Sequence, residues 1–183
     1  RKALPLTFSY FTGYFQPKVC CKTEEILGVE VLARWLPEDG SAAPSPAVFI
    51  PVAEETGLIW ALSESMINQA ARDIVAWQNQ GVCMKYSINV SARQFSDDNF
   101  CNQAIEQFER LGVDPATVQI ELTESVLLND TKRSLEKIQE LKSKGFMIAL
   151  DDFGTGFSSL HYLTLFPFDT LKVDRAFVTN IIE

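Results

Sequence analysis

The sequence predicts an α/β fold in which parallel strands are covered by helices. Short apolar runs rich in β-branched residues alternate with longer segments whose apolar residues recur at helical spacing. No low-complexity linker or internal repeat interrupts this alternation over the 183 residues. With 46% hydrophobic residues, the chain can bury the core of one ordinary domain. We therefore expect a single domain over residues 1–183.

The first half of the chain predicts a strand pair followed by helices. Residues 13–21 and 27–35 are apolar runs separated by the polar sequence KTEE, which is typical of a turn between two strands. Residues 44–59 combine loop residues with a short helix. Apolar residues then recur at helical spacing over residues 62–77, and Gly81 marks the end of that helix.

The second half continues the alternation. Four further strands are predicted, at residues 85–91, 118–124, 147–153 and 170–175. Gly112 marks the end of a helix over residues 100–111, and Gly145 marks the end of a helix over residues 135–141 whose N-cap is Asn129 or Asp130. The last helix is expected within residues 158–166.

About six strands are therefore expected, whereas a closed (β/α)8 barrel usually takes about 250 residues. We predict a TIM-like (β/α)8 barrel whose C-terminal strands are missing from this chain. An open doubly wound sheet is the alternative architecture. The chain begins with Arg1 rather than Met and stops at Glu183 within an apolar pattern, so we expect a piece of a longer multidomain protein.

Composition limits the partners and the location. A net charge of −8 argues against DNA and anionic membranes, because binding to either requires a basic patch. No segment approaches the roughly 20 uninterrupted apolar residues of a membrane helix, and we expect a cytoplasmic domain. The four cysteines show neither CxxC spacing nor a disulfide framework, so we expect buried free thiols at Cys20, Cys21, Cys83 and Cys101.

Polar residues stand at the ends of five predicted strands: Glu30, Asn89, Glu121 with Glu124, Asp151 with Asp152, and Lys172 with Asp174. In parallel α/β folds the C-terminal ends of the strands share one rim, so these side chains should converge. A single acid at a strand end is more often a helix cap or an ion-pair partner than a ligand. Five strands with the same feature are poorly explained in that way.

The converging carboxylates predict a site for divalent cations. Carboxylates packed together raise each other's pKa, and a hard cation removes that penalty. Carboxylate and amide oxygens suit Mg²⁺ or Mn²⁺. His161 is the only histidine, so a histidine zinc site or a Ser-His-Asp triad is not expected, and we assign it to the surface or to packing. Two metal ions that polarise a phosphodiester and activate water are the most natural chemistry.

Ordered motifs along the whole chain resemble the EAL family of cyclic diguanylate phosphodiesterases: FQPKV, GVEVLARW, FIPVAEETGLI, INVSARQF, ELTES, ALDDFGTGFSSLHYL and LKVDRAFV. The resemblance implies hydrolysis of cyclic diguanylate (c-di-GMP) to linear pGpG by two Mg²⁺ or Mn²⁺ ions. It also implies a barrel whose first strand is antiparallel. Val31 stands where the family has the alanine of its name, and the change adds bulk without charge.

The resemblance also implies roles for individual residues. One metal ion would be held by Glu30, Asn89, Glu121 and Asp151, and Asp152 would reach the second. Lys172 would position the attacking water or the phosphate with support from Asp174, and Glu124 would support the loop that begins at Asp152. The substrate contacts would be Gln16, Leu32 and Arg34. Without the family pattern, Gln16 could equally be a turn residue and Arg34 an ion-pair partner.

Two alternatives to an enzyme stay open. The family's general-base glutamate lies beyond LKVDRAFV and is absent from the chain, which favours a degenerate domain that binds c-di-GMP as a receptor. The segment after Asp152, around Phe157, is similar to the family's dimerisation element, so a homodimer or a non-enzymatic interaction module is also expected from it. Sensory or GGDEF domains are expected in the parent protein.

Overall fold

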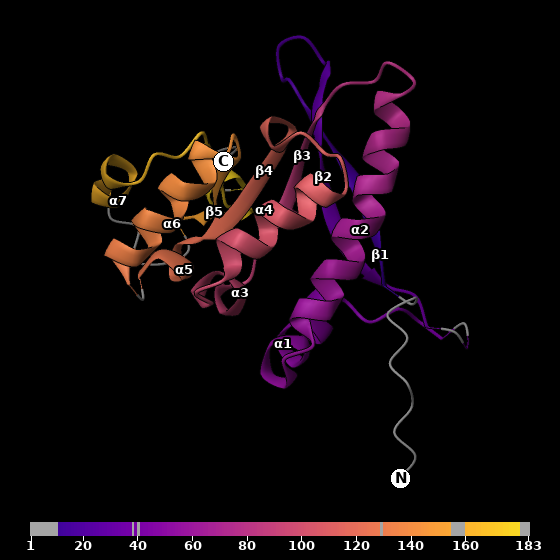
Figure 1. The fold of residues 1–183 in the computed structure, drawn as a ribbon, viewed down its shortest axis with the longest axis horizontal. Helices are drawn as coiled ribbons and strands as arrows, with labels where there is room; N and C mark the ends of the chain where they lie inside the picture. Colours follow the sequence, from indigo (N-terminus) through magenta and orange to yellow (C-terminus); the bar gives the residue numbers. More distant parts are fainter. Residues whose placement is uncertain (1–10, 38, 40, 129, 155–159, 180–183) are drawn as a thin grey trace.

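A mixed six-stranded sheet forms the centre of the protein (Figure 1). The structure is a computed structural model, and it describes residues 11–37, 39, 41–128, 130–154 and 160–179. The strands are β1 (Phe11–Val19), β2 (Ile26–Trp35), β3 (Lys85–Asn89), β4 (Val118–Thr123), β5 (Met147–Phe153) and β6 (Thr170–Val173). β1 pairs with β2 antiparallel, and all later pairs are parallel.

The strand order decides between the two architectures that the sequence left open. The strands lie in the order of the chain, β1-β2-β3-β4-β5-β6, whereas a doubly wound sheet reverses its order at a switch point. Each parallel crossover simply adds the next strand at one edge, as in a (β/α)8 barrel. The prediction of a TIM-like barrel with an antiparallel first strand is confirmed, with six strands in the described part of the chain.

Helices follow the strands and lie along one side of the sheet, with α2, α4 and α6 in front of it in Figure 1. They are α1 (Pro46–Thr56), α2 (Ile59–Gln78), α3 (Ala92–Ser96), α4 (Phe100–Arg110), α5 (Glu124–Leu128), α6 (Thr131–Ser143), α7 (Leu160–Leu165) and α8 (Arg175–Thr179). Asp130 caps α6 by accepting a hydrogen bond from the Arg133 backbone N–H at 3.1 Å. The predicted cap is thus found at the second of its two candidate positions.

The hydrophobic core fills the space between this side of the sheet and the helices. Tyr86 of β3, Ile120 of β4 and Ile148 of β5 are buried there with Ile74 of α2 and Ile138 of α6. Consecutive residues of β4 are buried from Val118 to Leu122. Since alternate residues point to opposite sides of a strand, β4 is buried on both faces. Its second face carries polar side chains, and that face positions the site.

The structure corrects two details of the sequence-based prediction. Glu124 is the first residue of α5 instead of the last residue of a strand, and α3, α5 and α8 were not predicted because each has only five residues. The cysteines are free, but only Cys101 is buried. Cys21 and Cys83 are exposed because they lie in the connections before β2 and β3.

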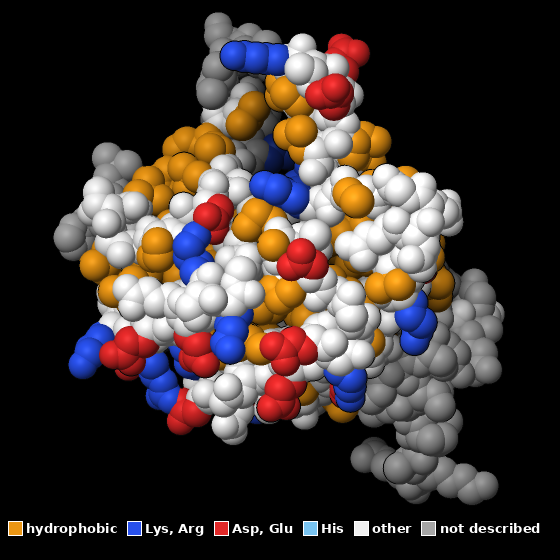
Figure 2. Space-filling view, turned by 45° about the horizontal axis from the view of Figure 1, so that its top comes forward, with side chains coloured by type: hydrophobic (Ala, Val, Ile, Leu, Met, Phe, Trp, Pro, Cys, Tyr) orange, Lys and Arg blue, Asp and Glu red, His pale blue; other side chains and the backbone are white. Residues whose placement is uncertain are grey.

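The surface drawn in Figure 2 carries both signs of charge. Lys and Arg side chains are interspersed with Asp and Glu on this face, and its described residues form no continuous basic patch of the kind that DNA binding requires. Among the helices described, none combines the length and the apolar character needed to span a membrane.

Candidate functional site

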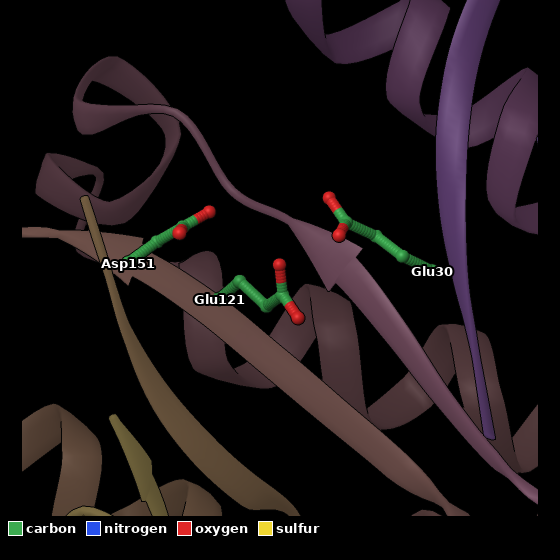
Figure 3. A group of neighbouring side chains, drawn as sticks. All are labelled: Glu30, Glu121 and Asp151. Carbon is green, nitrogen blue, oxygen red and sulfur yellow. The ribbon is translucent and has the colours of Figure 1, made fainter. Parts of the chain in front are cut away.

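Three carboxylates from three strands meet at one end of the sheet. One oxygen each of Glu30 (β2), Glu121 (β4) and Asp151 (β5) lies within 4.8 Å of the other two (Figure 3). The register explains the convergence, because Asn89 of β3 stands beside Glu121 and Thr123 stands beside Asp151 in the parallel ladder. The carboxyl ends of parallel strands therefore bring these acids to a common rim, as the sequence predicts.

Lys172 of β6 lies among these three acids. Its ammonium donates hydrogen bonds to Asp151 Oδ2 at 2.7 Å, to Glu30 Oε2 at 3.2 Å and to Glu121 Oε2. Glu121 has a fully buried side chain, and those of Glu30 and Asp151 are each 16% exposed. One cation thus neutralises part of a group of three acids that would otherwise repel each other strongly.

The pKa values of Lys172 and Glu121 both lie above their ordinary values, for different reasons. Burial alone would lower the pKa of Lys172, but its hydrogen bonds to Asp151 and Glu121 outweigh that effect and the pKa lies above its ordinary value. Burial raises the pKa of Glu121, against the opposing effect of the hydrogen bond from Lys172. The Glu121 carboxylate is therefore a costly charge that only nearby cations can hold in place.

The donor set fits a hard divalent cation. Asn89 donates its Nδ2 to Glu30 Oε1 at 2.8 Å, which leaves its amide oxygen available as a ligand beside the three carboxylates. Oxygen donors without histidine or thiolate suit Mg²⁺ and Mn²⁺ rather than zinc or copper. Four of the predicted metal ligands, Glu30, Asn89, Glu121 and Asp151, are brought together in the structure.

Asp152 follows Asp151 in β5, at an irregularity of the strand pairing. β5 carries two residues, Asp151 and Asp152, opposite the single residue Lys172 of β6, which is a bulge in the ladder. Asp152 has φ 52° in the left-handed region, and its backbone N–H donates to Asp151 Oδ1 at 2.8 Å. Burial, and then the charges of Asp151 and Asp174, raise the pKa of Asp152. Asp152 is exposed, and it is not one of the three acids whose oxygens converge.

Glu124 and Asp174 each accept a hydrogen bond from the backbone, at the end of β5 and at the start of α8 respectively. Glu124 Oε1 accepts a hydrogen bond from the backbone N–H of Gly154 at 3.1 Å, just after Asp152. Asp174 follows β6, and its Oδ1 accepts from the backbone N–H of Ala176 at 2.7 Å at the start of α8. The contact of Glu124 lies at the start of the segment after Asp152, whereas that of Asp174 lies at the start of α8.

The predicted substrate contacts lie on β1 and β2 next to the acids. Gln16 stands opposite Glu30 in the middle of β1, so it is not a turn residue. Leu32 and Arg34 line a hollow of about 560 Å³ between the ends of β2 and β3 and the helices α1 and α2. The Arg34 guanidinium lies 5.5 Å from the centre of the Tyr14 ring and forms no ion pair within the described part of the chain.

A second layer of polar side chains lies directly below the acids. Lys18 of β1 donates to Gln119 Oε1 at 2.9 Å and to Ser87 Oγ, and its Nζ lies 3.4 Å from Glu121 Oε1. Gln119 in turn donates its Nε2 to Thr170 Oγ1 at 2.7 Å. Glu121 is therefore contacted by a lysine on each of its two oxygens, Lys18 on Oε1 and Lys172 on Oε2.

The sequence-based analysis missed this layer, although a signal for it exists. Ser87, Gln119 and Thr170 each precede a predicted site residue by two positions, so they point to the same face of their strands. Lys18 follows Gln16 by two positions and therefore also shares a strand face with a predicted site residue. By contrast, the predicted dimerisation segment around Phe157 lies outside the described residues, and so does the side chain of His161.

Comparisons with known proteins identify the family of the chain. The family model of the EAL domain matches residues 6–183. Protein y4lL of Sinorhizobium fredii is 42% identical over 168 residues, which are 91% of this chain and 20% of that protein. The cyclic di-GMP phosphodiesterase PdeR of Escherichia coli K12 is 35% identical over 168 residues, 92% of this chain and 25% of that protein. The chain thus spans about a fifth to a quarter of the length of these relatives.

Solved structures show the same fold. A MucR phosphodiesterase in complex with c-di-GMP superposes with a TM-score of 0.87 at 34% identity, covering 95% of this chain and 70% of that one. The FimX EAL domain superposes with a TM-score of 0.85 at 21% identity, over 95% of this chain and 70% of that one, and supports the fold alone. With a family model that matches nearly every residue, and with relatives above 30% identity over more than nine-tenths of its length, the chain belongs to the EAL domain family.

Proposed function

We propose that this EAL domain hydrolyses one phosphodiester bond of c-di-GMP to give linear pGpG. The observation that carries the proposal is the meeting of Glu30, Asn89, Glu121 and Asp151 from the successive strands β2 to β5, with Lys172 among them. Relatives such as PdeR are described as cyclic di-GMP phosphodiesterases, and the MucR phosphodiesterase was solved with c-di-GMP. A degenerate domain typically loses acids of this kind, and this chain has all of those expected within its length.

The site is proposed to take two Mg²⁺ or Mn²⁺ ions. Glu30, Asn89, Glu121 and Asp151 would hold the first, and Asp152 would contribute to the second from across the bulge. Bound ions of this kind polarise a phosphodiester and lower the pKa of water. The buried carboxylates supply the negative charge that selects a divalent cation, and their rigid strands fix the ligand positions.

The remaining side chains would act on the phosphate and the bases. Lys172 is close enough to the acids to stabilise negative charge that develops on the phosphate oxygens or to orient the attacking water. Arg34 carries a planar guanidinium suited to a second phosphate, and Leu32 offers an apolar contact to a guanine ring in the same hollow. Gln16, exposed on β1, can exchange hydrogen bonds with a base edge. Glu124 would support the segment that follows Asp152, and Asp174 would support Lys172 from the end of β6.

The organisation of the whole protein is also a proposal. The chain forms one domain, and its share of the relatives' length supports additional domains, which we propose to be sensory or GGDEF domains. We further propose a cytoplasmic location and a homodimer formed through the segment after Asp152.

The experiment that tests the function is a hydrolysis assay on the full-length protein. Purified protein is incubated with c-di-GMP and Mn²⁺, and pGpG is quantified by chromatography. The Asp151→Asn variant and a chelator-treated sample serve as comparisons. Metal-dependent pGpG formation that is lost in both is expected. Tight binding of c-di-GMP without product, from folded and metal-loaded protein, would instead support a receptor.

A further inference from the structure

Lys172 holds the central position in the group of acids. Its ammonium contacts one oxygen of each of Glu30, Glu121 and Asp151, and these are the acids whose oxygens converge within 4.8 Å. An ammonium and a divalent cation compete for the same lone pairs, because both are held by the negative charge of the carboxylates.

The second lysine provides an internal comparison. Lys18 contacts only one of the three acids, with its Nζ 3.4 Å from Glu121 Oε1. Its other side-chain hydrogen bonds go to the neutral partners Gln119 and Ser87. A β-bulge between Lys18 and Val19 lies beside it, and such bulges redirect side chains. Lys18 therefore contacts Glu121 on Oε1, the oxygen that does not accept from Lys172.

We propose that Lys172 occupies the cation position of the metal-free site and is displaced when a divalent cation binds, whereas Lys18 stays on Glu121 in both states. The inference rests on the proposed function and extends it to the way in which the site is loaded. In the metal-free protein Lys172 limits the repulsion between three acids from β2, β4 and β5. Once displaced, its ammonium is free to contact the substrate phosphate.

The exchange has a consequence that a purely catalytic lysine would not have. Removal of Lys172 should slow turnover and at the same time tighten metal binding, because the cation no longer has to break three hydrogen bonds to enter. Removal of Lys18 also takes one positive charge away from Glu121, so any general electrostatic effect is common to both variants. Only removal of Lys172 clears the position among the three acids.

The experiment measures Mn²⁺ affinity in the full-length protein by the electron paramagnetic resonance signal of free Mn²⁺, independently of turnover. We expect the dissociation constant of Lys172→Met to fall at least about tenfold, since three charge-assisted contacts are removed. For Lys18→Met we expect a change of less than about threefold, since a single contact at 3.4 Å is lost. Lys142→Met, whose side chain is 28% exposed and paired only with Asp169, is the control outside the site.

Unchanged or weaker Mn²⁺ binding by Lys172→Met, with wild-type affinity measurable, would overturn the exchange and leave the proposed function standing. Equal tightening in Lys172→Met and Lys18→Met would also overturn it, because charge alone would then explain both. A wild-type protein that binds no Mn²⁺ would overturn the proposed function as well. If Lys172→Met does not fold, Lys172→Gln keeps a neutral hydrogen-bond donor and carries the same expectation.

Discussion

Replacement of Glu121 by glutamine tests how the buried charge affects the stability of the fold and how it affects metal binding. The Glu121 side chain is fully buried, and burial is the main cause of its raised pKa. A carboxyl group whose pKa is higher in the folded state destabilises the fold when it is ionised, by about 1.4 kcal/mol for each pKa unit. Glutamine has nearly the same shape and carries no charge, and replacement of a buried charge by a neutral group is often stabilising.

The magnitude follows from the contacts that remain. Without Glu121, Lys172 keeps Glu30 and Asp151, and Lys18 keeps its neutral partners, so no lysine is left alone. We therefore expect the metal-free Glu121→Gln variant to be more stable than the wild type by about 1 kcal/mol, or about 2–4 °C in Tm for a chain of this size. Metal reverses the order, because a ligand at 100 times its Kd stabilises the wild type by about 2.7 kcal/mol.

The assay is thermal unfolding with a chelator and again with saturating Mn²⁺. Glu136→Gln is the control, since that glutamate is 64% exposed and forms only a 4.0 Å pair with Lys132. Because the pKa of Glu121 is raised in the folded state, the metal-free wild type should gain stability as the pH falls through that pKa. The glutamine variant should lack this gain. A variant that is less stable in chelator, and that gains as much from Mn²⁺ as the wild type, would show that the buried charge of Glu121 neither costs stability nor binds metal.

Three further predictions concern the loop, the substrate and the thiols. Glu124→Ala removes the acceptor of the Gly154 N–H, and we expect turnover at saturating Mn²⁺ to fall about tenfold as the end of β5 loses its position; unchanged turnover would contradict this support. Arg34→Lys should raise the KM for c-di-GMP about tenfold without changing Mn²⁺ affinity, because lysine cannot replace a bidentate guanidinium; a change in Mn²⁺ affinity alone would contradict it. Iodoacetamide should label exposed Cys21 in the native protein and label Cys101 only after unfolding. The reason is that burial raises the pKa of the Cys101 thiol to about 12. Mass spectrometry that finds Cys101 labelled first would count against its burial.

The parts of the fold that the sequence predicts are those that depend on local patterns. Six strands, the main helices between them and the parallel order all follow from alternating apolar runs and from stop signals such as Gly112 and Gly145. Convergence of Glu30, Glu121 and Asp151 follows as well, because parallel strands place their carboxyl ends on one rim. These features need only the period of each segment and the rule of right-handed crossovers.

The parts that the sequence does not predict depend on contacts between distant strands. The contact between Lys18 and Glu121 depends on the antiparallel register of β1 against β2. No pattern within a single strand predicts that register. The bulge at Asp151 and Asp152 depends on the pairing of β5 with β6. The exposure of Cys21 depends on where a turn ends relative to the core.

The central claim is that this arrangement of oxygens and lysine hydrolyses c-di-GMP with divalent metal. The most direct measurement is the time course of pGpG formation by the full-length protein, with Mn²⁺ and with chelator, beside the Glu121→Gln variant. The account predicts product only from the wild type with metal. Equal pGpG formation by the wild type in chelator, or by the glutamine variant with Mn²⁺, would contradict it.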